Sequence, residues 1–291
     1  MKNKDVILLN KKFNEEQLQP KISDVINLME KIAPSSLALP EDKIGLQLGK
    51  ENTTVKSILI SLDVTEEVIE EAVEKEVNLI IAHHPIIYRS LQEINFSKYP
   101  SSIIRKAILS DISIYIAHTN LDIAPGGIND ILSEILEVEK IKPLLPLRDN
   151  PEFGIGKIGT LKEEKSLEEI AKITEEKLKS SHIKVAGKLH RKIKRIAICS
   201  GSGKDLIYPA CQKKAELFIT GELGYHATLE VKSLGLCVIE AGHYETEVVV
   251  LPFLREKLEK EFKEKSWEGK IFQSKIYTSP YLPKNLSQVD L

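Results

Sequence analysis

Cysteine is scarce in this chain. Its 291 residues include only three cysteines, and Cys199, Cys211 and Cys237 lie far apart without forming a C-x-x-C pair. An odd and scattered set of this kind excludes a disulfide framework and the ligand spacing of a zinc finger.

Long apolar stretches are also absent. After Met1 and the polar residues 2–5, the N-terminal region has only four apolar residues in a row, which is too short for the core of a signal peptide. No later stretch approaches the roughly 20 apolar residues of a membrane helix. We therefore expect a cytoplasmic protein with no membrane partner.

Neither sign of charge dominates. Lysine and arginine together number 41 against 43 aspartate and glutamate, so the net charge is −2. No global field therefore attracts nucleic acid, and the basic run 188–195 is expected at a solvated edge. With 42% hydrophobic residues, the chain can form one large or two ordinary globular domains.

What the first half does contain is a series of apolar runs that end in polar residues. Three runs predict strands, at residues 57–62, 78–82 and 112–117. Helical spacing and capping residues predict helices at residues 22–32, 65–75 and 101–109. This alternation is typical of parallel βαβ units.

The three predicted strands end at Asp63, at the adjacent pair His83 and His84, and at His118. Pro85 holds His84 extended and stops the strand, so the two imidazoles can splay and each hold a different metal ion. The alternative is that one histidine is hydrogen-bonded within the core and that the other is exposed to solvent. Ligand sites in open α/β sheets lie outside the carboxyl ends of strands, which favours the metal interpretation.

The second half repeats this plan. Predicted strands at 195–199, 216–220 and 236–241 end at a turn over 200–203, at Gly221-Glu222 and at Gly242-His243. We therefore predict an α/β fold of two similar lobes related by a repeat of pattern, at residues 21–142 and 143–275. An N-terminal extension (1–20) and a C-terminal tail (276–291) flank them, and the prolines and polar residues over 143–151 mark the junction.

Two further segments contain closely spaced glycines. Residues 154–159 spell G-x-G-x-x-G, but they follow a turn and lead into no helix, so a glycine-rich strand is expected in place of a dinucleotide site. Residues 119–127 are expected to form a loop because they end in Pro125 and two glycines.

Histidines paired with carboxylates supply the candidate chemistry. His243 and Glu247 lie four apart and share one face if they are helical; alternatively, Glu247 only favours a helix N-terminus. His118 and Asp122 have the same spacing, with a turn-forming aspartate as the alternative. Mixed imidazole and carboxylate ligation suits zinc, iron, manganese, nickel or cobalt. Two such ions would attract an anionic substrate and generate a hydroxide nucleophile near neutral pH.

These motifs resemble, in combination and order, the family of type 2 homologues of GTP cyclohydrolase I, which are hexameric proteins with a dinuclear metal centre. The resemblance covers about residues 21–270. It rests on Ala33-Pro34, Gly45-Leu46-Gln47-Leu48-Gly49, Leu62-Asp63-Val64-Thr65, His83-His84-Pro85, His118-Thr119-Asn120-Leu121-Asp122, Gly154-Ile155-Gly156-Lys157-Ile158-Gly159, Ser200-Gly201-Ser202-Gly203, Thr220-Gly221-Glu222 and Gly242-His243-Tyr244-Glu245-Thr246-Glu247.

The resemblance implies two divalent metal ions in a cleft between the lobes, and a ring-shaped homohexamer. The implied ligands are His83, His84, Asp122, His243 and Glu247. Glu247 would bridge the ions, and His118 would be a ligand or orient one. Larger members carry a domain inserted between the lobes, for which residues 143–154 leave no room, and the first twenty residues and those after 270 lie outside the resemblance.

Three functions are compatible with this reading. The first is a metal-dependent hydrolase of a nucleotide or another phosphorylated small molecule, as the family name suggests. The second is a non-catalytic metal-binding or metal-handling protein, and the third is an interaction scaffold with a regulatory role. Glu222 and His226 are, with His118, candidates for acid–base catalysis; the alternative is a loop carboxylate and a packed histidine.

Overall fold

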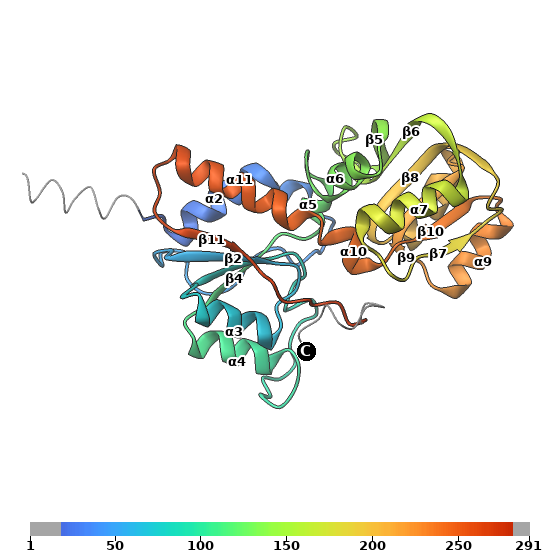
Figure 1. Cartoon of the computed structure of the whole chain (residues 1–291). Coiled ribbons are helices and arrows are strands. Elements are labelled where there is room, and N and C mark those ends of the chain that lie inside the picture. Colours follow the sequence, from blue (N-terminus) through green and yellow to red (C-terminus); the bar gives the residue numbers. More distant parts are fainter. Residues whose placement is uncertain (1–18, 282–291) are drawn as a thin grey trace, which may run out of the picture. The chain divides into compact units, whose positions relative to one another are not determined.

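The computed structural model describes residues 19–281, which form two compact units. Unit 1 contains residues 19–118 and 251–276, and unit 2 contains residues 119–250 and 277–281. The predicted N-terminal extension lies almost entirely outside the described residues, as does the tail beyond residue 281. Each unit is built on one sheet with helices on both faces, so the predicted α/β class is confirmed (Figure 1).

The sheet of unit 1 has the order β1-β4-β3-β2-β11. Its strands are β1 (Gly45–Leu48), β2 (Ser57–Ser61), β3 (Leu79–Ala82), β4 (Ser113–Ile116) and β11 (Lys270–Gln273). The inner strands β2, β3 and β4 are parallel to one another, and β11 adds to β2 in the same direction. Only β1 is antiparallel to its neighbour. The predicted βαβ units are thereby confirmed.

Helices cover both faces of this sheet. They are α2 (Ile22–Ile32), α3 (Glu66–Glu74), α4 (Ser101–Leu109) and α11 (Val250–Glu264). Helices α2 and α11 lie on one face, and α3 and α4 lie on the other (Figure 1). As the sequence predicts, the Thr65 side chain caps α3 by accepting a hydrogen bond from Val68 N. Apolar side chains from alternate strand positions, such as Ile80 and Ile114, fill the core under α3 and α4.

The sheet of unit 2 has the order β5-β6-β8-β9-β10-β7. Its strands are β5 (Val138–Pro146), β6 (Gly154–Ser166), β7 (Lys184–Ala186), β8 (Lys192–Ser202), β9 (Leu217–Glu222) and β10 (Cys237–Glu240). Strands β8, β9 and β10 are parallel, and the outer pairs are antiparallel. The glycines of 154–159 lie in β6, which confirms the predicted strand.

Alternate residues of these strands pack on different helices. The helices of unit 2 are α5 (Thr119–Ile123), α6 (Ile128–Ile135), α7 (Leu167–Leu178), α8 (Ile207–Gln212), α9 (Tyr225–Ser233) and α10 (His243–Glu247). Ile196 and Ile198 of β8 belong to the core formed with α6 and α7. Their neighbours Ala197 and Cys199 belong to the core formed with α8 and α9. The sheet is therefore buried on both faces, as its continuous apolar runs predict.

The predicted repeat is present in the order of elements. In unit 1 the chain runs β2-α3-β3-α4-β4, and α5 follows as the first helix of unit 2. Within unit 2 the same order recurs as β8-α8-β9-α9-β10 followed by α10. In each sheet the three parallel strands are neighbours in sequence order. Both α5 and α10 are helices of five residues that start within three residues of the third strand.

Three local predictions were wrong. Residues 143–146 belong to strand β5, not to a junction; β5 is an edge strand, where proline removes no ladder hydrogen bond. Residues 119–123 form helix α5, because Pro125 follows its last turn without interrupting it. Residues 200–202 continue β8 through a bulge and do not form a turn. The bulge gives Gly201 a φ of +58°, a conformation that favours glycine.

The division into units also differs from the predicted boundary between residues 142 and 143. The chain enters unit 2 after His118 and returns to unit 1 after Val250. The return has a physical cause, because β11 pairs with β2 and thus completes the first sheet. Within residues 19–281, no helix combines the length and the apolar character required to cross a membrane.

Candidate metal centre

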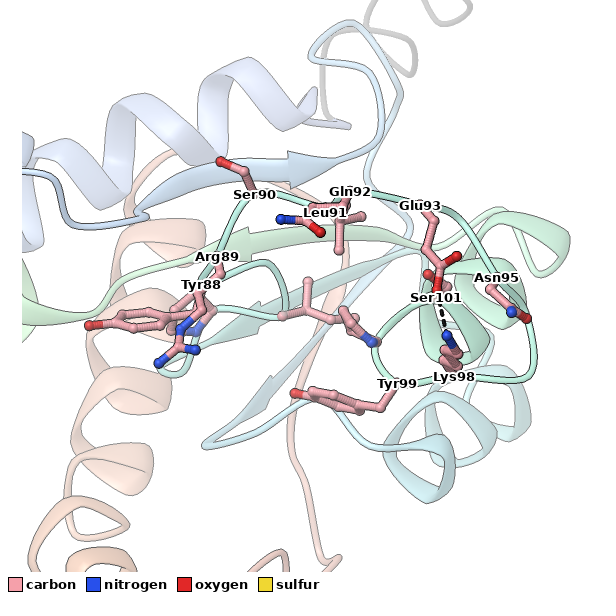
Figure 2. A pocket seen from close by; sticks show the side chains of 13 residues that line it. Tyr88, Arg89, Ser90, Leu91, Gln92, Glu93, Asn95, Lys98, Tyr99 and Ser101 are labelled. Atoms are coloured by element: carbon pink, nitrogen blue, oxygen red, sulfur yellow. Dashed lines mark hydrogen bonds and ion pairs between the residues drawn. The ribbon is translucent and has the colours of Figure 1, made fainter.

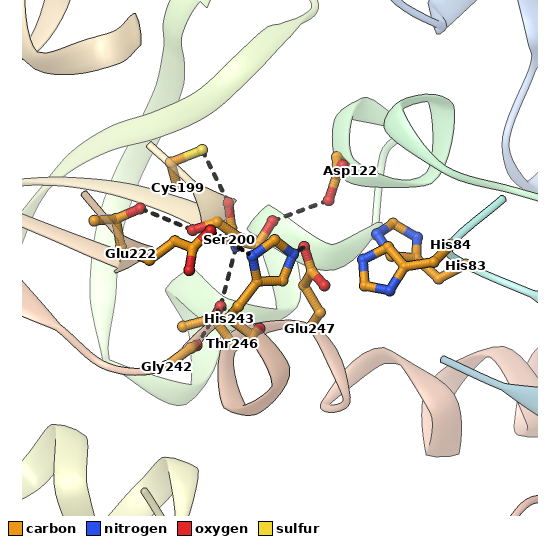
Figure 3. A network of polar contacts seen from close by, with 12 residues as sticks. His83, His84, Asp122, Cys199, Ser200, Glu222, Gly242, His243, Thr246 and Glu247 are labelled. Carbon is orange, nitrogen blue, oxygen red and sulfur yellow. Dashed lines mark hydrogen bonds and ion pairs between the residues drawn. The ribbon is translucent and has the colours of Figure 1, made fainter. Parts of the chain in front are cut away.

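Strand β3 delivers His83 and His84 as predicted. The strand ends at Ala82, and the backbone N–H groups of both histidines donate to Leu62 O, at 3.1 and 2.9 Å. His83 is 2% exposed, whereas His84 is half-buried. The two rings lie next to each other, with centroids 4.9 Å apart and an interplanar angle of 51° (Figure 3).

His118, which follows β4, joins this pair. Its ring centroid lies 5.0 Å from that of His83 and 5.9 Å from that of His84. One ring nitrogen from each of the three histidines lies within 4.8 Å of the others. A metal–nitrogen bond is about 2.1 Å long, so two ligands of one ion lie at most about 4.2 Å apart. The cluster thus has nearly the dimensions of a coordination sphere.

Each of the three imidazoles is oriented by a hydrogen bond from Nδ1. His83 donates to Ala117 O at 2.9 Å, because a carbonyl oxygen can only accept. His84 is paired with Asp63 Oδ1 at 2.7 Å, and His118 with Asp42 Oδ1 at 2.8 Å. With Nδ1 protonated, Nε2 carries the lone pair that binds a metal. The oxygen partners are the type that normally supports metal-binding histidines.

Two of these partners were missed by the sequence analysis. Asp42 lies 76 positions before His118, in a loop that carries no periodic signal. Ala117 contributes only its carbonyl group, which no side-chain pattern can indicate. Asp63 could be found, because it follows a predicted strand end.

Helix α10 of unit 2 places His243 and Glu247 on one face, as predicted. His243 Nε2 lies 3.2 Å from Glu247 Oε1, and His243 Nδ1 lies 3.3 Å from Glu222 Oε1. The imidazole therefore lies between two carboxylates, each facing a different ring nitrogen (Figure 3). Glu247 is only 4% exposed, so its carboxylate needs polar or charged partners to offset the loss of water.

Asp122 is held by the bulge at the end of β8. Ser200 Oγ donates to Asp122 Oδ1 at 2.9 Å (Figure 3). The fully buried Asn129 connects the same two segments, since its Nδ2 donates to Asp122 O at 3.1 Å and its Oδ1 accepts from Ser200 N at 2.9 Å. These bonds fix both the backbone and the carboxylate of Asp122.

The next residue in the bulge, Gly201, faces Glu247. Gly201 N donates to Thr246 Oγ1 at 3.1 Å, which ties the bulge to α10. A Cβ at position 201 would lie only 2.2 Å from Glu247 Oε1. Glycine is required here because the carboxylate occupies the space that a side chain would fill. The Ser200-Gly201 motif thus has a structural explanation.

Cys199 and His226 are not among the candidate ligands. Burial raises the pKa of the Cys199 thiol, and the carboxylates of Asp122 and Glu247 add to the rise. The thiol therefore stays protonated, and it lies 3.2 Å from Ser200 O. His226 is exposed on α9 with its ring against Tyr225. Among residues 19–281, no hydrogen bond or ion pair joins His226 to the groups around His243.

The donor groups fit a divalent transition metal. They consist of imidazole nitrogens and carboxylate oxygens, the mixture that suits zinc, iron, manganese, nickel and cobalt. In unit 1, the three histidines already present their nitrogens together. In unit 2, Asp122, His243 and Glu247 are each held by a hydrogen bond or ion pair.

The chain matches the family model of Duf34/NIF3 (NGG1p interacting factor 3) over residues 20–280. The match extends ten residues beyond residue 270, so the expected end of the resemblance was placed too early. Strand β11 and the residues after it are part of the family fold.

Relatives agree with this match. A "GTP cyclohydrolase 1 type 2 homolog" of Clostridium perfringens is 38% identical over 240 residues, covering 82% of this chain and 91% of its own length. A protein of the same name from Bacillus subtilis is 28% identical over 362 aligned residues, covering 88% and 97%. That alignment is longer than this chain, so the B. subtilis protein contains additional residues. The crystal structure of a Bacillus cereus protein related to NIF3 is similar with a TM-score of 0.85 and 28% identity, covering 90% of this chain and 99% of the other.

Proposed function

Because the chain belongs to the Duf34/NIF3 (NGG1p interacting factor 3) family, we propose that it is a dinuclear metal protein that hydrolyses a nucleotide or another phosphorylated small molecule. The observation that carries the proposal is the cluster of His83, His84 and His118, whose ring nitrogens lie within 4.8 Å of one another. Each Nδ1 is also paired with an oxygen, which is the arrangement that supports metal-binding histidines.

The proposed ligands combine the donors of both units. The two ions would be held by His83, His84, Asp122, His243 and Glu247, as the family resemblance implies. The position of His118 supports a role as a further ligand. When bound, divalent ions of this kind activate water near neutral pH and stabilise negative charge on a phosphoryl oxygen.

Neighbouring residues orient the ligands and move protons in this proposal. Ser200 holds the Asp122 carboxylate, and Asp63 and Asp42 hold His84 and His118. Glu222 is 54% exposed in its side chain and contacts His243 Nδ1. An exposed carboxylate beside a ligand can accept a proton from water and pass it on, which makes Glu222 a better candidate for the acid–base residue than His226.

A second candidate function is non-catalytic metal binding, in metal handling or in a regulatory complex. The burial of His83 and Glu247, at 2% and 4% exposure, favours it. Structural metal sites are closed by protein ligands, whereas catalytic sites keep one coordination position for water or substrate.

Metal analysis tests the shared part of both functions. Protein purified without chelators should contain about two transition-metal ions per chain. His83→Ala and Asp122→Ala should each lose most of that metal, whereas the exposed His190→Ala should keep it. Metal-free wild-type protein under these conditions would refute both functions.

Turnover then separates the two. The wild type, loaded with each of the candidate metals, should hydrolyse p-nitrophenyl phosphate or a nucleotide, and Glu247→Ala should not. Activity that persists in Glu247→Ala would identify a contaminating enzyme. A metal-loaded wild type without turnover of any nucleotide or phosphomonoester would favour the non-catalytic function.

The ring-shaped homohexamer is part of the same proposal. Light scattering of the purified protein should give six times the chain mass of 32.7 kDa. A monomer or dimer at micromolar concentration would contradict the hexamer without affecting the metal assignment.

A further inference from the structure

A pocket of about 400 Å³ lies in the loop that directly follows the histidine pair. It is lined by 13 residues between Pro85, next to His84, and Ser101, at the start of α4 (Figure 2). A volume of this size falls within the range of small-molecule sites. All of its lining residues belong to unit 1.

The loop is held by specific hydrogen bonds. At its start, the Gln47 side chain of β1 donates to Ile87 O at 3.2 Å and accepts from Ile87 N at 2.9 Å. At its far end, Lys98 N donates to Asn95 O at 2.9 Å, and Lys98 Nζ pairs with Glu93 at 2.6 Å. These contacts hold the two ends of the loop, which reduces the entropy lost on binding.

The lining contains two tyrosines, Tyr88 and Tyr99, and two cationic side chains, Arg89 and Lys98. Tyr88 and Tyr99 are 61% and 73% exposed, whereas aromatic rings usually pack their faces against other side chains. Lys98 is already paired with Glu93. Across the part of the chain that the structure describes, Arg89 has no carboxylate partner. Figure 2 shows Tyr88, Arg89 and Tyr99 on the same loop.

Tyr99 also connects this pocket to the histidine cluster. The side chain is largely exposed, but partial desolvation raises the pKa of its phenol, and the Asp63 carboxylate adds to the rise. The phenol therefore lies within electrostatic range of Asp63, the residue that orients His84.

We infer that this pocket binds the organic part of the substrate, and that the substrate is a nucleoside phosphate. Its base would stack on Tyr99, and the guanidinium of Arg89 would form a forked pair with a phosphate group. Tyrosine faces stack on nucleobases of any sequence, and arginine matches the geometry of phosphate oxygens. The inference rests on the proposed function and adds a substrate class to it.

Calorimetric titration of the metal-loaded full chain with GMP, guanosine and inorganic phosphate tests this assignment. Tyr99→Ala should weaken binding of GMP and of guanosine by about tenfold or more, which corresponds to the loss of one stacking contact. Arg89→Gln should weaken GMP by a similar factor and leave guanosine unchanged. Inorganic phosphate should bind the wild type and Tyr99→Ala equally.

Two variants serve as matched controls. Tyr225→Ala removes a tyrosine that is 75% exposed, and Arg148→Gln removes an exposed loop arginine, both in unit 2. Neither should change GMP affinity. Metal content and light scattering of every variant show whether the metal centre and the assembly are intact.

The outcomes separate this inference from the proposed function. Unchanged GMP affinity in both pocket variants would overturn the pocket assignment, even if p-nitrophenyl phosphate turnover still depends on His83. Wild-type protein that hydrolyses p-nitrophenyl phosphate but binds no GMP would also overturn it. If Tyr99→Ala alters the assembly and not the affinity, the loop is a subunit contact. Pocket-dependent GMP binding without turnover would support the pocket and refute the hydrolase.

Discussion

Replacing Gly201 by alanine would move a proposed metal ligand without removing it. The added methyl group would lie 2.2 Å from Glu247 Oε1 and 3.2 Å from His243 Nε2. Both atoms are the ends of side chains, so the clash falls on the donor groups and not on the backbone. Glu247 is buried, however, and has little room in which to retreat.

The expected loss of metal affinity follows from these distances. Ordinary van der Waals contact requires Oε1 to move by about 1 Å, whereas metal–ligand distances tolerate only about 0.2 Å. Displacing a group that supports or forms a metal site typically lowers affinity about 10- to 100-fold, or about 1.4 to 2.7 kcal/mol. Alanine at a φ of +58° adds backbone strain of about 1–2 kcal/mol to the folded state.

Gly235 provides a control that separates these two effects. It has a φ of +75°, and a Cβ there would meet nothing within 4 Å. Gly235→Ala therefore carries the backbone strain without the clash. In competition with a chelator of known affinity, Gly201→Ala should release metal at a lower chelator concentration than the wild type or Gly235→Ala. Equal retention by the two variants would refute the placement of Glu247 in the metal centre.

Two further predictions concern buried polar contacts. Ser200→Ala should lower metal affinity about tenfold, because Asp122 loses a donor that orients it; chelator competition measures this, and unchanged affinity would contradict it. Burial alone would raise the pKa of Glu71, but hydrogen bonds from Lys75, Ser274 and Lys275 N lower it overall. Glu71 therefore stabilises the fold above its ordinary pKa of 4.5, and this contribution is lost as pH falls through the lower folded-state pKa. Urea unfolding should show Glu71→Gln destabilised by about 2 kcal/mol at pH 7 and by less at pH 3, with the exposed Glu74→Gln unchanged; an equal loss at both pH values would refute the ionic contribution.

Much of the centre is predictable because of a rule about parallel sheets. The carboxyl ends of parallel strands lie at the same edge of a sheet. Once three apolar runs are assigned as parallel strands, His83, His84 and His118 are therefore expected to lie close together. His243 and Glu247 could be paired because helical spacing places residues four apart on one face. These inferences need only local patterns.

Contacts between distant segments could not be predicted in the same way. The pairing of His118 with Asp42 and the hydrogen bonds of Gln47 with Ile87 join segments that are 76 and 40 positions apart. The addition of β11 to β2 depends on the direction in which the chain continues after α11, and the four residues 270–273 show no strand periodicity that would reveal it. The bulge at Gly201 was taken for a turn, since glycine favours both.

The repeated order of elements has a consequence for the origin of the donor groups. In each series, a histidine follows the third parallel strand, and a carboxylate comes four residues later: His118 with Asp122, and His243 with Glu247. The second strand ends in His83-His84 in one series and in Glu222 in the other. A βαβαβα arrangement that occurs twice in the chain therefore places a histidine and a carboxylate at matching positions in both series. The two series differ after the second strand, where one offers imidazole nitrogens and the other a carboxylate oxygen.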